Sequence, residues 1–238
     1  MNLLLNILIN KKGGVSLKDT NRVYWNEQFK ILQDTWPKPD NFENCINIFL
    51  ILHGMVHSLQ VSALNFSFED ELWSKMNEVV FRRLFKGEQP IAWKLWHTAR
   101  IEDIVMNILV ANRSQVMTSQ DWAKELKVDF YDTGNAMNEN EIAQLSNSID
   151  LSALRGYRNA VGLNTIEIVK NLKPEDMKKK VEPSGLRRLL DEGAVVSEAK
   201  GLLDYWGKKT YSGLLLMPAS RHIFIHLNES FRLLAKRA

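Results

Sequence analysis

The sequence predicts an all-α fold: a four-helix bundle with an additional N-terminal helix and two helical insertions. Apolar residues recur at spacings of three and four through the long hydrophobic stretches, as one face of a helix requires. Among the 238 residues there are only twelve glycines and six prolines, so long segments run without a helix breaker. A hydrophobic content of 45% and a charged content of 25% are typical of a globular domain. We expect one domain, residues 18–238, after a flexible N-terminus at residues 1–17.

The first half of the chain is predicted to hold two bundle helices and the additional helix. The additional helix covers residues 18–36 and ends where Pro37 follows. The first bundle helix is expected from Asn41 to Leu64, with Asp40 or Asn41 as its N-cap. A short helix then begins after Ser67, which with the acidic residue three positions later resembles a capping box. The second bundle helix is expected at residues 91–111, opened by Pro90.

The second half is predicted to alternate insertions with long helices. Residues 112–149 form a polar insertion with short helices at 121–126 and 139–145. The third bundle helix covers residues 151–172, and a second insertion follows with short helices at 174–180, 183–191 and 196–203. The last helix is expected at residues 210–235. Pro218 lies inside it and must kink the helix or mark its restart, which changes the direction of the side chains one turn later.

Net charge and cysteine content limit which partners and which cellular compartment this protein can have. The formal net charge of +3 is nearly balanced, and acidic and basic residues alternate, so neither a nucleic-acid nor a membrane partner is expected. The apolar residues 1–9 are far fewer than the roughly 20 that cross a bilayer, and no signal-peptide cleavage site follows them. The single cysteine, Cys45, excludes an internal disulfide and predicts a small core residue in a reducing compartment. We therefore expect a cytoplasmic protein.

The five histidines all fall in the predicted long helices, and four of them form two pairs with a spacing of four residues: His53, His57, His97, His222 and His226. Imidazoles four residues apart leave the same face of a helix, roughly 6 Å from each other, and can converge on one ion. The last pair together with His97 would give three ligands and an open fourth position, as in catalytic zinc sites. His53 and His57 are candidates for an additional ligand or a substrate contact, and His57 is the candidate catalytic group that handles protons. The alternative for each is a packing residue.

Charged residues near these histidines have candidate roles as well. Glu102, Asp103 and Glu229 lie within two turns of a candidate ligand and could orient imidazole N–H groups, although a solvated surface position is the favoured alternative. Arg100 or Arg221 could bind an anionic group, with structural pairing as the default interpretation.

Two motifs resemble a known family. These are a His-x-x-x-His pair on the last helix and, on the second bundle helix, the segment Ala92-Trp93-x-x-Trp96-His97-x-Ala99-Arg100. They resemble the DinB superfamily of bacterial four-helix metalloproteins, over most of the chain from about residue 41. The resemblance implies a DinB-type bundle, a homodimer, and a divalent metal, zinc or nickel, bound by His97, His222 and His226.

The resemblance also implies a class of activity. Members of the superfamily include metal-dependent transferases and isomerases that use low-molecular-weight thiols. We therefore expect a metal-dependent transferase or hydrolase that acts on a small-molecule substrate, with a low-molecular-weight thiol as the candidate. The additional N-terminal helix, the two insertions and the pair of His53 and His57 depart from the family pattern.

Two further interpretations remain open. The chain could be a non-catalytic bundle in which a metal with four protein ligands ties helices together, or a metal-free dimerisation module. A closed metal site would indicate the first, whereas an open position that faces a pocket would indicate an enzyme.

Overall fold

The computed structural model describes residues 17–36, 39–75 and 77–236, and in these ranges it is all-α without a β-strand. The predicted all-α class is confirmed for the described residues, while the DinB-type bundle stays a prediction. The flexible start predicted for residues 1–17 lies outside the described residues except for Leu17, which begins the first helix. No described helix combines the length and the apolar character that crossing a bilayer requires.

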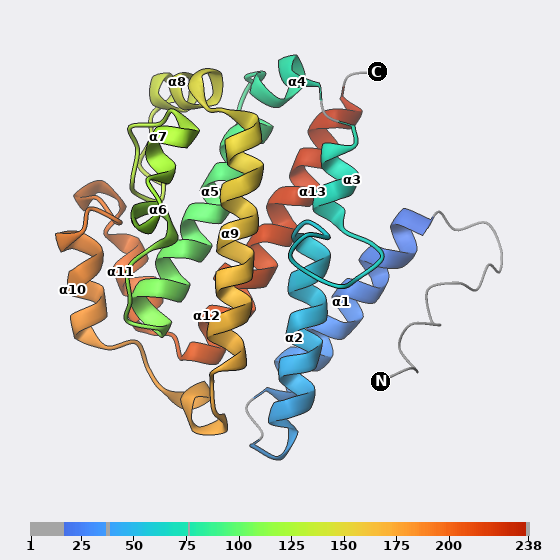
Figure 1. Ribbon diagram of the computed structural model, residues 1–238, viewed down its shortest axis with the longest axis vertical. Coiled ribbons are helices and arrows are strands. Elements are labelled where there is room, and N and C mark those ends of the chain that lie inside the picture. The colour runs from blue at the N-terminus through green and yellow to red at the C-terminus, as the bar shows by residue number, and fades with distance from the viewer. Residues whose placement is uncertain (1–16, 37–38, 76, 237–238) are drawn as a thin grey trace.

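The longest described helices run along the molecule and pack on one another (Figure 1). They are α1 (Leu17–Thr35), α2 (Phe42–Val56), α5 (Ile91–Ile104), α9 (Leu151–Lys170) and α13 (His222–Ala235). The central α5 packs against α9 and α13, while α2 packs against α1 and α9. All five positions agree with the predicted long helices, although two of the boundaries differ, as described below.

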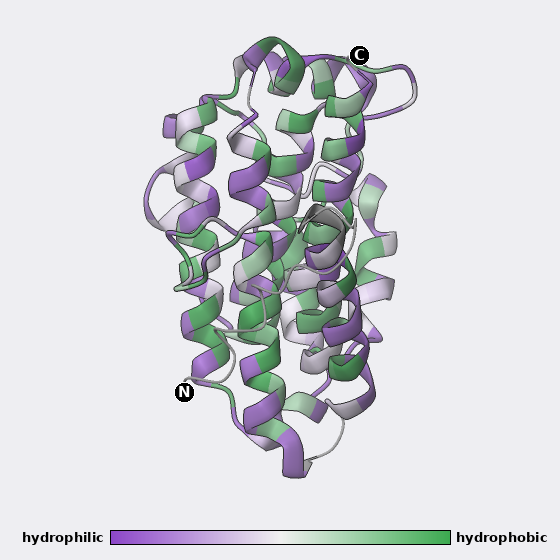
Figure 2. Cartoon of the chain, turned by 90° about the vertical axis from the view of Figure 1, so that its right-hand side faces the viewer, coloured by the Kyte–Doolittle hydropathy of each residue, from purple (hydrophilic) through white to green (hydrophobic). Residues whose placement is uncertain are grey.

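Short helices connect and cover the long ones. They are α3 (Phe68–Trp73), α4 (Glu78–Arg82), α6 (Val116–Ser119), α7 (Trp122–Leu126), α8 (Glu139–Ser148), α10 (Pro183–Asp191), α11 (Gly201–Gly207) and α12 (Tyr211–Leu216). The 3-10 turns are η1 (Pro39–Asn41), η3 (Pro174–Lys178) and η4 (Ser197–Ala199), and the π segments are η2 (Val105–Val110) and η5 (Met217–Arg221). Sequence reasoning missed α4 and α6, and it merged η4 with α11. Hydrophobic and hydrophilic residues alternate around the helices (Figure 2), as amphipathic helices require.

The helix α5 is buried along its entire length, and not on one face only. Its charged residues Lys94, Arg100, Glu102 and Asp103 are each at most 3% exposed. A charge buried in this way must be paired, because its desolvation is costly. The side chains of α5 therefore bind partners on the surrounding helices, and these partners build the sites described below.

The helix α2 ends at Val56, eight residues before the predicted end at Leu64. His57 already has extended backbone angles, and the segment after it folds back across α2 at Gly54. A Cβ at Gly54 would lie 2.8 Å from Cβ of Ser62, so the glycine permits this close return. The prediction that all five histidines lie in long helices was therefore wrong for His57, which lies directly after α2.

The last predicted helix consists of α12 and α13, joined by the π segment η5 that contains Pro218. Proline has no N–H to donate, so a regular α-helical turn cannot be completed there. The buried hydroxyl of Ser220 donates to the carbonyls of Leu215 and Leu216, at 3.0 and 2.8 Å. The predicted disturbance at Pro218 thus takes the form of a π turn, and α13 begins directly after it with His222.

Candidate metal centre

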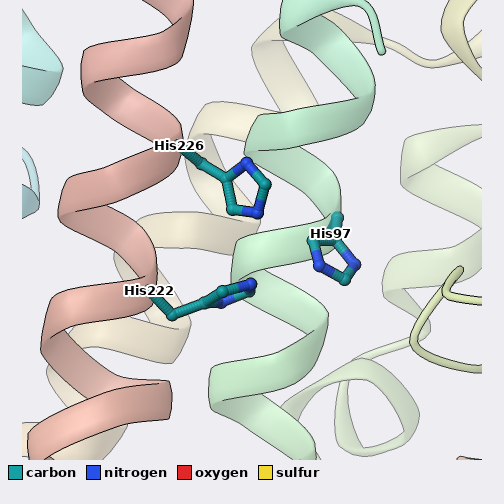
Figure 3. A group of neighbouring side chains, drawn as sticks. All are labelled: His97, His222 and His226. Carbon is teal, nitrogen blue, oxygen red and sulfur yellow. The ribbon is translucent and has the colours of Figure 1, made fainter. Parts of the chain in front are cut away.

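Three histidines from two helices meet between α5 and α13 (Figure 3). The ring centroid of His97 lies 5.0 Å from that of His222 and 5.4 Å from that of His226. The two rings on α13 lie 4.7 Å apart. Each residue offers one ring nitrogen, and these three atoms lie within 4.8 Å of one another. The expected meeting of the three rings is thus observed, while metal binding by them stays a prediction.

The ring of His97 is held by contacts on two sides. It stacks on Trp93, with centroids 4.4 Å apart and planes inclined by 11°. Its Nδ1 lies within hydrogen-bond distance of the main-chain carbonyl of Thr133, which can only accept, so Nδ1 carries the proton. Nε2 is therefore the nitrogen with a free lone pair. Such an outer hydrogen bond is the usual way in which proteins orient a metal-binding histidine.

A glycine turn places the carbonyl of Thr133 against α5. Gly134 has φ +77°, and its N–H donates to Oδ1 of Asp132 at 2.6 Å. A Cβ at Gly134 would lie 2.6 Å from Cζ3 of Trp96, so only glycine allows the loop to approach this closely. Sequence reasoning missed Thr133. The Asp-Thr-Gly-Asn turn at 132–135 was the available signal, although it does not name a partner.

The ring of His226 is oriented by a carboxylate. Nδ1 of His226 donates to Oε2 of Glu229 at 2.8 Å, and Nζ of Lys94 donates to the same oxygen at 2.7 Å. The hydrogen bonds from His226 and from the buried Lys94 together lower the pKa of Glu229 to about 2, against the opposing effect of burial. Glu229 is therefore ionised at neutral pH and leaves Nε2 of His226 free. The orienting role considered for Glu229 agrees with this contact.

His222 carries a nitrogen that the described residues leave without a hydrogen-bond partner: its Nδ1 is buried and unpaired. Burial lowers the pKa of His222 well below its usual value, and it lowers the pKa of His97 to about 3, assisted by His226 in both cases. Both imidazoles are therefore neutral at neutral pH, which is the state that binds a metal. Three imidazoles, two of them held neutral by burial, fit a divalent transition-metal ion.

The other pair of histidines meets a different partner. Nε2 of His53 lies 2.7 Å from Oε1 of Glu102, and Nε2 of His57 lies 2.9 Å from Oε2. All three side chains are 0% exposed. The structure thus brings His53 and His57 together with Glu102, in a group separate from the one that contains His97.

The favoured surface interpretation of two carboxylates was wrong, since Glu102 and Asp103 are fully buried. Asp103 binds Arg100, the hydroxyl of Tyr157 and two main-chain N–H groups, and it touches no histidine. For Arg100 the default structural interpretation agrees with this pairing. Arg221 binds Asn26 and lies over aromatic rings, which is also a structural role.

No protein-family model and no curated protein matches this chain. The likeness to the DinB superfamily therefore stays a resemblance, carried by the motifs around His97 and on α13. What the structure adds is an all-helical fold with a three-histidine group between two of its long helices.

Proposed function

We propose that this chain is a divalent-metal-dependent enzyme of DinB type, in which His97, His222 and His226 hold zinc or nickel. The helices α2, α5, α9 and α13 would be the four helices of the bundle. One observation carries the proposal: three imidazoles converge from two helices, and outer hydrogen bonds direct Nε2 of His97 and of His226 away from their orienting partners.

The chemistry follows from the donor set. A divalent ion on three histidines keeps a position for a water or a thiol and lowers the pKa of that ligand toward neutrality. Glu229 accepts a hydrogen bond from Nδ1–H of His226 and keeps this ring in one orientation, while Lys94 compensates the charge of the carboxylate. The carbonyl of Thr133 likewise accepts a hydrogen bond from Nδ1–H of His97 and orients that ring, and it carries no net charge. The substrate proposed is a small molecule that reacts with a low-molecular-weight thiol, in a transferase or hydrolase reaction.

The exposure of the group favours an enzyme over a purely structural metal. A structural site is closed by four protein ligands. Here the group comprises three ligand residues among those the structure describes, and the side chains of His226 and Glu229 are 18% and 24% exposed. We place the approach of the small ligand on the side of His226. The alternative, a non-catalytic bundle with a structural or dimerisation role, requires no such opening.

The proposed function is tested by turnover. Zinc-loaded and nickel-loaded protein is incubated with a panel of small thiols and electrophiles, and thiol consumption is followed. We expect turnover by the wild type, none by the metal-free protein, and none by His226→Ala. The control is Ile225→Ala, which changes a partly exposed neighbour on the same helix and should retain turnover. Metal binding without turnover across the panel would favour the structural alternative, and absence of metal binding would favour the dimerisation module.

A further inference from the structure

The group formed by His53, His57 and Glu102 has no part in the proposed reaction, yet its geometry is closely defined. It lies between the end of α2 and the middle of α5, and its three side chains are completely buried. The carboxylate of Glu102 faces both imidazoles, one with each oxygen, and the two rings lie 4.3 Å apart at 37°.

Charge balance distinguishes Glu102 from the other buried acids. Glu69 binds the guanidinium of Arg158 with both oxygens, at 2.8 and 2.9 Å, and Asp103 binds Arg100. For Glu102 the described residues supply two imidazoles and no lysine or arginine at ion-pair distance. A buried carboxylate without a compensating cation is strongly unfavourable, so this group requires a positive charge, either a proton on one of the imidazoles or a bound cation.

The surrounding chain makes room for this geometry. His57 follows the last residue of α2, where its N–H donates to the carbonyl of His53 and its own carbonyl accepts from Ser67. Its ring packs against α9 at Gly162, where a Cβ would lie 2.9 Å from Nδ1 of His57. Glycine at this position is thus what admits the imidazole.

We propose that His53, His57 and Glu102 form a second divalent-metal site, distinct from the three-histidine group and structural in role. Two neutral imidazoles and one carboxylate are a donor set for zinc or ferrous iron. With both carboxylate oxygens engaged, the set supplies four donor atoms, which closes the site as a structural zinc requires. The positive charge of the ion compensates Glu102, and the complete burial excludes substrate.

The protons can be accommodated. Coordination through Nε2 moves the proton of each imidazole to Nδ1, and both Nδ1 atoms are buried without a hydrogen-bond partner among the described residues. Nδ1 of His57 lies 3.9 Å from Oε2 of Glu69, so its proton would face a carboxylate. The nitrogen-to-oxygen distances of 2.7 and 2.9 Å are those of a direct hydrogen bond. Donor atoms around one zinc lie roughly 3.3 Å apart, so small outward movements of the side chains are sufficient.

The test counts zinc ions per chain. Because the site is buried, the chain is unfolded, stripped of metal and refolded with zinc, and loosely bound zinc is removed before elemental analysis. We expect two ions in the wild type, one in Glu102→Gln, one in His226→Ala and none in the double variant. Glutamine has nearly the shape of glutamate but lacks its charge. The matched control is Asp103→Asn, which alters an equally buried carboxylate on α5 and should retain two ions.

The contrary results are equally definite. Two ions in Glu102→Gln, or a single ion in the wild type that His226→Ala removes completely, would overturn the second site and leave a proton as the cation beside Glu102. If Glu102→Gln does not refold, His226→Ala decides alone, because its side chain is 18% exposed whereas that of Glu102 is completely buried. One retained ion in that variant supports the second site, and none overturns it. If the three-histidine group binds no metal but the second site does, His226→Ala still retains one ion. Each proposal can therefore be refuted without the other.

Discussion

At the scale of single residues, the property that matters is which ring nitrogen of each histidine is free. Thr133 and Glu229 determine it for His97 and His226, since each accepts a hydrogen bond from Nδ1–H. The contacts of Thr133 with His97 and of Glu229 with His226 are independent of the four-residue spacing by which the histidines were identified. The ligands and their partners can therefore be tested separately.

Replacing Glu229 by glutamine should weaken zinc binding at the three-histidine site by about 10–100-fold, because the outer carboxylate raises the basicity of the ligand and fixes its orientation. Competition with a chromophoric chelator measures the affinity. Glu167→Gln is the control, since the carboxylate of Glu167 is exposed and pairs with Arg113, away from the three histidines. An affinity equal to that of the wild type would show that Glu229 does not act on His226.

Replacing Gly134 by alanine should displace the turn that carries Thr133 and weaken zinc binding as well as stability. The added methyl group would meet Trp96 at 2.6 Å, and φ of +77° is unfavourable for alanine. Gly87→Ala separates the two effects, because Gly87 has φ +75° but no atom within 4 Å of the place that its Cβ would take. The control should lose about 1 kcal/mol of unfolding free energy through the backbone alone and keep the zinc affinity. Equal zinc affinity in both variants would argue against the role of Thr133.

The residue types and their spacing were sufficient to predict the group of His97, His222 and His226. The carbonyl of Thr133 could not be predicted, because a main-chain acceptor has no residue signature. Glu102 was assigned to the surface because a charged residue on an amphipathic helix normally faces water. That reasoning fails on α5, which other helices cover on every side.

At the scale of elements, Arg158 connects three helices. From α9 it binds Glu69 on α3, and it donates to the carbonyl of Leu95 and the hydroxyl of Thr98 on α5. All four polar side-chain contacts are buried, so they hold the three helices in one register. No local pattern indicates the pair of Arg158 and Glu69, because the two residues are 89 positions apart.

Replacing Arg158 by methionine should destabilise the fold by about 3–5 kcal/mol, because it leaves Glu69 as an unpaired buried charge. The double variant Arg158→Met with Glu69→Leu should recover most of the loss, since both charges are then absent. Urea unfolding followed by circular dichroism measures both values. A double variant as unstable as the single one would indicate that the contacts to α5 matter more than the ion pair.

The same ion pair predicts a pH dependence. Burial opposes ionisation of Glu69, but Arg158 outweighs it, so the pKa of Glu69 lies below its ordinary value of 4.5. A lowered folded-state pKa means that the pair stabilises the fold above pH 4.5 and that this contribution is lost as the pH falls through the folded-state pKa. The unfolding free energy of the wild type should therefore fall more steeply below pH 4.5 than that of the double variant. Parallel curves would contradict the assignment.

Helix positions were predictable from periodicity and caps, whereas two ends were not. The early end of α2 depends on the return of residues 57–66 across Gly54, which is a tertiary contact. The π segment at Pro218 agrees with the expectation that proline disturbs the last helix there, but its form depends on Ser220. Local pattern thus locates an element, and packing decides where it ends.

At the scale of the whole molecule, metal binding should be linked to folding. The three-histidine group draws one ligand from α5 and two from α13, and the second group draws its ligands from the α2 end and from α5. An ion that binds only the folded chain stabilises it by mass action. The all-α class could be predicted from composition and periodicity, but the assembly of these groups depends on helix packing that periodicity does not specify.

Zinc at about 100 times the dissociation constant of the three-histidine site should raise the unfolding free energy by about 2.7 kcal/mol through that site. In chains that also carry Glu102→Gln, so that the second proposed site does not bind zinc, His226→Ala should lack this increment and Ile225→Ala should keep it. Thermal unfolding with and without zinc, after removal of metal, measures the difference. A zinc-dependent increment of equal size in His226→Ala would show that the stabilisation comes from elsewhere.

The most direct test of the account is anomalous diffraction at the zinc edge, from crystals of the chain produced without a polyhistidine tag and grown with zinc. We predict a peak between α5 and α13, about 2.0–2.1 Å from Nε2 of His97, from Nε2 of His226 and from one ring nitrogen of His222. A map with no peak at this position, or with zinc on the α13 pair but out of reach of His97, would contradict the three-histidine metal centre.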